Sequence, residues 1–99
     1  MTKILFWEHA PGWRPQDFVR SDVPRAKREY LARILANGHV AASYKGWANC
    51  RLCDAPLGSA DLHGHGFTWP AKAEHYVLEH DVWTPGCAAL YAAICAKGT

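Results

Sequence analysis

Two cysteines and two histidines in the second half of the chain have the types and spacing of metal ligands. Two residues separate Cys50 from Cys53, so both thiolates can reach one ion from a tight turn. Four residues separate His75 from His80, within the spacing usual for paired histidine ligands. Two thiolates and two imidazoles favour zinc in tetrahedral geometry. Because four protein ligands leave no position for an activated water, the set predicts a structural zinc ion and no catalytic residue.

The two histidines must be positioned by one helix and its end. Pro70 is expected to open a helix that runs from Ala71 to about Glu79. At about 100° per residue, positions five apart on an ideal helix diverge by about 140°. His75 and His80 can therefore converge only if the regular helix ends near Glu79 and His80 turns in from the boundary.

A hairpin is expected between the cysteines and this helix. Residues 56–66 are rich in Gly, Ser, Asp and His, and Ala60–Leu62 and Phe67–Trp69 are short extended pieces beside them. The order of cysteine turn, hairpin and helix is that of a ββα zinc finger. The sequence thus predicts a zinc-finger-like unit over about residues 44–82.

Three further elements are expected before this unit. Lys3–Trp7 is apolar and predicts a first strand. An amphipathic helix is expected between Asp22, as its cap, and Gly38, whose left-handed conformation would end it. After it, residues 39–44 predict a strand, Lys45 and Gly46 a turn, and residues 47–50 a second extended piece.

The last helix is framed by Thr84 as cap, Pro85 in its first turn and Gly98 after its end. Nearly its whole circumference is apolar or Ala, which is typical of a helix buried on most sides or covered by a partner. The expected fold class is α+β. A single zinc-stabilised domain over residues 1–99 would combine the finger-like unit, the amphipathic N-terminal helix and the apolar C-terminal helix.

The composition and the lengths of the apolar stretches exclude several classes of protein. The chain has 99 residues, 49% of them hydrophobic, and a formal net charge of +2, which excludes a disordered tail. The longest apolar stretch, residues 87–96, would rise about 15 Å as a helix, half the roughly 30 Å of a bilayer core. We therefore expect no membrane span. The apolar run within residues 1–7 is too short for a signal peptide, so we expect a cytoplasmic protein with reduced cysteines.

Two alternative sites remain open. Basic residues on and before the first helix could track a phosphate backbone, although a solvated helix face has the same composition. They are Arg20, Arg25, Lys27, Arg28 and Arg33. Separately, Asp61, His63 and His65 could form the open metal site of a hydrolase, although the flanking glycines favour an exposed loop tip without a ligand role for the two histidines. No HExxH helix supports that hydrolase hypothesis.

The stretch from residue 44 to residue 82 resembles a group of small bacterial and phage-associated proteins of unassigned function. Their pattern is Tyr-x-Gly-Trp leading into CRxCG, then Gly-Ser, then Trp-Pro-Glu-Gly-Leu-x-His-Tyr with a second His. The matching residues here are Tyr44, Gly46, Trp47, Cys50, Arg51, Cys53, Gly58, Ser59, Trp69, Pro70, His75, Tyr76 and His80. Asp54 stands where the pattern has Gly. The resemblance implies metal at Cys50, Cys53, His75 and His80, and no activity.

The function that these patterns favour is macromolecular binding by a small zinc-stabilised module. Another protein, or a second copy of the chain bound through the C-terminal helix, is the first expected partner, and nucleic acid is the alternative. Trp13 and Trp83 lie in Pro-containing segments and are candidates for the contact surface.

Overall fold

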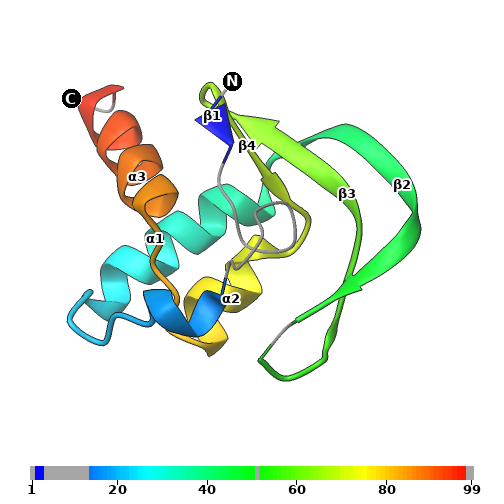
Figure 1. The fold of residues 1–99 in the computed structure, drawn as a ribbon. Coiled ribbons are helices and arrows are strands. Elements are labelled where there is room, and N and C mark those ends of the chain that lie inside the picture. The colour runs from blue at the N-terminus through cyan, green and yellow to red at the C-terminus, as the bar shows by residue number, and fades with distance from the viewer. Residues whose placement is uncertain (1, 4–13, 51, 98–99) are drawn as a thin grey trace.

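The computed structural model describes residues 2–3, 14–50 and 52–97, which form an α+β fold (Figure 1). Four strands, one short 3-10 helix and three α-helices follow one another along the chain. They are β1 (Thr2–Lys3), η1 (Pro15–Phe18), α1 (Arg25–Ala36), β2 (His39–Asn49), β3 (Pro56–Gly64), β4 (Phe67–Pro70), α2 (Ala73–Glu79) and α3 (Pro85–Lys97). Of the expected first strand, only Lys3 lies within the described residues.

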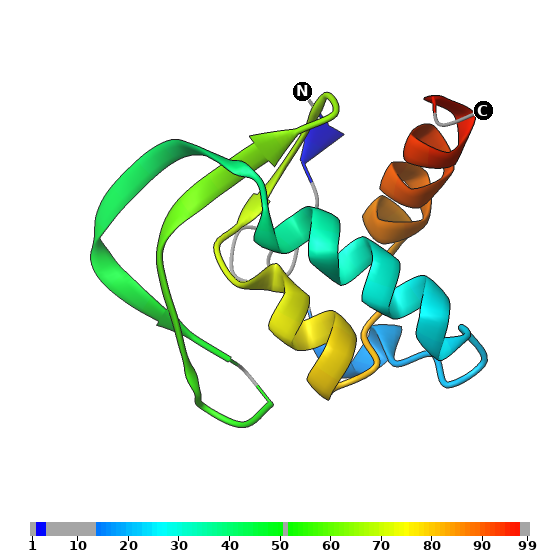
Figure 2. The same cartoon turned by 180° about the vertical axis from the view of Figure 1, so that it is seen from behind.

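The strands form one sheet in the order β1-β4-β3-β2. β2, β3 and β4 are antiparallel, and β1 runs parallel to β4. Strands β2 and β3 make a long arm that curves away from the helices and returns with its tip beside α2, as the two opposite views show (Figures 1 and 2).

The predicted hairpin is confirmed as β3–β4, and both strands are longer than expected. Its loop is His65–Gly66, between the paired residues Gly64 and Phe67. Both loop residues have positive φ, 54° and 82°, which is the conformation of a two-residue type I′ turn. His63, expected at the loop tip, lies within β3 opposite Thr68.

The predicted turn at Lys45 and Gly46 is wrong, because β2 continues through it. The register with β3 changes between Ser43, opposite Ala60, and Ala48, opposite Gly58. The extra residues of β2 form an irregular stretch in one strand, a place where glycine is common. Pairing with β3 on both sides keeps the chain extended there.

Helix α1 begins without the predicted cap. The helix starts at Arg25 after Pro24, and no side chain caps it. The Asp22 carboxylate instead accepts two hydrogen bonds from the Arg20 guanidinium, both at 3.1 Å. Gly38 is also not left-handed, since the positive-φ glycines of the described chain are Gly58 and Gly66.

Helix α3 has the predicted cap: the Cys87 N–H donates to Thr84 Oγ1 at 3.2 Å. One face is buried through Cys87, Leu90 and Ile94, whereas Ala88 and Ala89 are exposed. Burial on most sides, one of the two alternatives expected for this helix, is thus wrong, because one face lies in the core and the other is exposed.

The core lies where the three helices meet β3 and β4. Its largest fully buried side chains are Trp69, Tyr76, Leu31, Leu35, Leu57, Leu90, Val77 and Val82. A separate zinc-finger-like unit within residues 44–82 is not confirmed, since core residues before and after it pack against those inside it. None of the helices in the described ranges combines the length and the hydrophobicity that a membrane span requires.

Candidate metal centre

The turn that carries the two cysteines joins β2 to β3 at the tip of the arm. The Asp54 N–H donates to the Cys50 carbonyl, and the Cys50 N–H donates to the Ala55 carbonyl, both at 2.8 Å. Asp54 closes the turn with a φ of 63°. Among residues other than glycine, aspartate is one of those that best tolerate this left-handed conformation.

The two histidines lie on α2 and at its end. The helix begins at Ala73, later than predicted, because Pro70 still belongs to β4 and Lys72 is left-handed with a φ of 61°. It ends at Glu79, as predicted, and His80 follows with a φ of −124°. The N–H groups of His80 and Val82 both donate to the Tyr76 carbonyl, at 3.2 and 3.0 Å. This sharp exit turns His80 toward His75.

The structure brings all four predicted ligands together. One ligand atom from each of Cys50, Cys53, His75 and His80 lies within 4.8 Å of the others. Cys53 Sγ is 3.3 Å from His75 Nε2, and the two imidazole centroids are 5.0 Å apart. Ligand atoms around a tetrahedral zinc ion lie roughly 3.3 to 3.8 Å from one another. A small contraction of the cluster would therefore complete a coordination sphere.

The environment of His80 also fits a metal ion. Its Nε2 is buried and has no hydrogen-bond partner among the described residues. Burial, and then the neighbouring His75, lower the pKa of His80 below its usual value, which favours the neutral imidazole. The neutral imidazole is the form that binds metal. A bound ion would satisfy an otherwise unpaired buried nitrogen.

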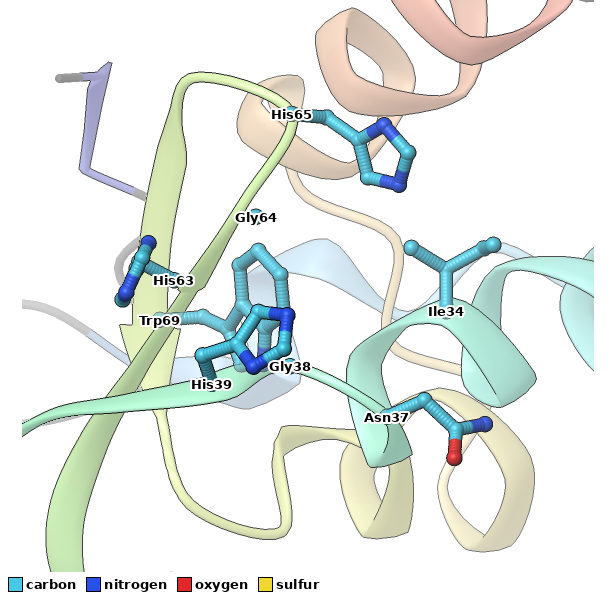
Figure 3. Close-up of a pocket in the computed structure, with 8 residues that line it drawn as sticks. All are labelled: Ile34, Asn37, Gly38, His39, His63, Gly64, His65 and Trp69. Atoms are coloured by element: carbon cyan, nitrogen blue, oxygen red, sulfur yellow. The ribbon is translucent and has the colours of Figure 1, made fainter.

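Within the described ranges, no second group of three or more potential ligands converges. Asp61, His63 and His65, the alternative site, do not come together. His39, His63 and His65 instead surround a pocket of about 220 Å³ beside Trp69. Figure 3 shows their rings spread around this pocket rather than meeting at one point. The geometry therefore gives the hydrolase hypothesis no ligand set.

The candidate nucleic-acid residues do not form one free basic surface. The side chain of Arg28 is buried; it donates to the Arg20 carbonyl and pairs with Asp81 Oδ1 at 3.1 Å. The exposed Arg25 pairs with Glu29 at 3.0 Å, as Arg20 does with Asp22. Arg28, at least, is unavailable to a phosphate backbone.

The remaining two basic residues also differ from each other. The Lys27 ammonium lies 4.7 Å from the ring centroid of Tyr91 and 5.6 Å from that of Trp83, whereas Arg33 is exposed. Trp83, predicted to be on a contact surface, is only 6% exposed. Trp83 lies against Lys27 of α1 and Tyr91 of α3, contacts that its neighbours in the sequence do not reveal. Trp13 lies outside the described residues.

No protein-family model, no curated protein and no solved structure matches this chain. The candidate function therefore depends on the geometry of the Cys50, Cys53, His75 and His80 cluster.

Proposed function

We propose that Cys50, Cys53, His75 and His80 bind one structural zinc ion, and that the chain is a small intracellular module that acts by binding another protein. The observation that carries the zinc assignment is the convergence of four ligand atoms within 4.8 Å. Thiolate and imidazole ligands in equal number suit tetrahedral zinc better than magnesium or calcium, which prefer oxygen. The proposed relation to the bacterial and phage-associated group rests on the matching residues between positions 44 and 82, which include these four.

The structural role follows from where the ligands lie. Cys50 and Cys53 sit at the tip of the β2–β3 arm, and His75 and His80 sit on α2 and at its end. Zinc would therefore tie the far end of the arm to the helical body. Two thiolates also balance the charge of the ion, so the closed site would be neutral and would lack a position for a reacting water.

Protein binding is supported by apolar surface. Among the described side chains, Val40 on β2 is 63% exposed, and Tyr30 on α1 is 40% exposed. The outer face of α3 adds exposed alanines, so this helix is the proposed site of self-association. An oligomer in size-exclusion chromatography, lost on replacing Ala89 by Glu, would support this surface. A monomer that captures no protein would contradict it.

Metal analysis tests the zinc assignment. Mass spectrometry should find one zinc ion per chain in the wild type and little in Cys53→Ser. Circular dichroism should show loss of folded structure with the metal, because the binding free energy of such sites is also folding free energy. A metal-free wild type, or a metal-free variant with an unchanged spectrum and unfolding curve, would refute the proposal.

A further inference from the structure

The two cysteines of the metal centre have different surroundings. Cys50 is 2% exposed, and its Sγ accepts a hydrogen bond from the Leu52 N–H at 3.4 Å. Cys53 is exposed, and its Sγ contacts His75 Nε2 at 3.3 Å. In the part of the chain that the structure describes, no backbone N–H donates to Cys53 Sγ.

This difference decides which sulfur can react. A thiolate is the nucleophilic form of cysteine, and a bound zinc ion keeps its thiolate ligands deprotonated near neutral pH. Burial blocks the approach of an electrophile to Cys50, and a donated N–H withdraws charge from its sulfur. Neither restriction applies to Cys53.

We propose that Cys53 is a modification site of the zinc centre and that its sulfur accepts an alkyl group from a small uncharged electrophile. This inference rests on the proposed zinc site. The Cys53 sulfur forms a bond to the electrophilic carbon while the bond from that carbon to its leaving group breaks. The leaving group departs with the electron pair of the broken bond. The sulfur becomes a neutral thioether, so the charge of the site rises by one.

The modification would act on the arm. A thioether is a weaker zinc ligand than a thiolate, and the remaining ligands would be one thiolate and two imidazoles. The tip of the β2–β3 arm would then lose one of its two attachments to the ion near α2. Alkylation of Cys53 would thereby cause release of the zinc ion, and the tip of the arm would no longer be held to α2.

The other cysteines allow a clean experiment. Cys87 is fully buried, and burial raises the pKa of its thiol to about 11, so it stays protonated and inaccessible. Cys95 is exposed on α3 and would compete for the reagent. The protein to use is therefore the full chain with Cys95→Ser. Because the exposed Asp54 carboxylate follows Cys53, the probe should be iodoacetamide, which carries no charge.

The zinc content of this protein is measured first, and iodoacetamide is then added at neutral pH. Peptide mapping should place the first carboxamidomethyl group on Cys53, about ten times faster than on Cys50. A chromogenic chelator should detect zinc release in step with that modification. Equal rates at Cys50 and Cys53, or a zinc-loaded protein that reacts only after a chelator removes the metal, would overturn the inference.

A second variant keeps the test informative. Cys53→His in the same background supplies a fourth ligand without a thiolate, so it should retain zinc and release none on treatment. Rapid zinc release from this variant would assign the reaction to another residue and overturn the inference. Zinc bound at one ion per chain with Cys53 unreactive would overturn this inference alone, whereas absence of zinc would overturn the proposed function as well.

Discussion

At the scale of single residues, the metal centre depends on backbone conformations that few residue types adopt. Asp54 at φ 63° and Asp81 at φ 56° are the left-handed residues that follow Cys53 and His80. Each lets the chain turn sharply just after a ligand. The Asn49 side-chain amide donates to Asp54 Oδ1 at 3.1 Å, which adds a local contact to the cysteine turn.

Replacing Asp54 by Val should destabilise the folded protein by about 1 to 2 kcal/mol, because a β-branched residue is strained at positive φ. Urea denaturation of the zinc-loaded protein measures this change. Asp54→Gly is the matched control, since glycine adopts the same conformation freely, and it should stay close to the wild type. Equal loss in both variants would show that the carboxylate, and not the backbone, matters here.

Asp81 has a second role, as the partner of the buried Arg28. Asp81→Asn keeps a side chain that tolerates positive φ but leaves the Arg28 charge without its carboxylate. The Asp81 side chain is 43% exposed, so solvent screens the pair, and we expect a loss of about 1 to 2 kcal/mol in unfolding free energy. A double-mutant cycle with Arg28→Met measures the coupling, and a coupling of zero would contradict the ion pair.

These residues also show what the sequence could predict. The ligand set was predictable because cysteine and histidine spacing is local, and so was the end of α2 at Glu79. The pairing of Arg28 with Asp81 was not, because the two residues are far apart along the chain and meet only when α1 packs beside α2. The prediction that Arg28 could contact a phosphate backbone was wrong for this reason.

At the scale of secondary-structure elements, close packing explains features that local propensity does not. A Cβ on Gly38 would lie 2.5 Å from Trp69 Cζ2 and 3.0 Å from Leu62 Cβ. Trp69 is itself fixed, since its Nε1–H donates to the Leu35 carbonyl at 2.9 Å. Gly38 therefore lets the start of β2 pass close to the indole, a role that its position after a helix did not predict.

Gly38→Ala should accordingly destabilise the protein by about 1 to 3 kcal/mol through overpacking against Trp69. The change should also alter the fluorescence of the tryptophans, and thermal unfolding followed by circular dichroism gives its size. In the control Gly66→Asn, the new Cβ meets open space and asparagine tolerates the positive φ, so the loss should be smaller. If both variants lose the same free energy of unfolding, the close contact at Gly38 does not explain the destabilisation.

Each predicted element boundary was confirmed or wrong for a physical reason that the contacts show. Thr84 was predictable as the cap of α3 because its partner, the Cys87 N–H, is three residues away. Asp22 failed as the cap of α1 because the nearby Arg20 guanidinium takes its carboxylate oxygens. The β2 turn failed because the pairing partner that keeps β2 extended is β3, later in the chain.

At the scale of the whole molecule, the metal centre joins two parts of different character. The helices and β4 supply most of the hydrophobic core, to which β3 adds Leu57, whereas the described side chains of β2 are mostly exposed and most of β3 is half-buried. Zinc at the tip of this arm would restrain two strands whose described side chains, apart from Leu57, are half-buried or exposed. The α+β class and the tie between the cysteine turn and the helix were predictable from element order and ligand spacing, but the long arm of β2 and β3 that carries the turn was not.

Removal of zinc with a chelator should therefore loosen the arm more than the core. Hydrogen exchange should rise most in residues 49–55 and in α2, and less in α1, whose Leu31 and Leu35 remain buried. The metal-free Cys53→Ser variant is the control, because the chelator should not change its exchange further. A uniform increase along the chain, or protection that is unchanged, would contradict the restraint.

The most direct test of the central claim is X-ray absorption at the zinc edge of the protein purified with its metal. The account predicts a first shell of two sulfurs at about 2.3 Å and two imidazole nitrogens at about 2.0 to 2.1 Å, with one ion per chain. Substitution of His80 by Ala should remove one nitrogen from that shell. A shell of oxygen atoms, a single sulfur, or no zinc at all would contradict the account.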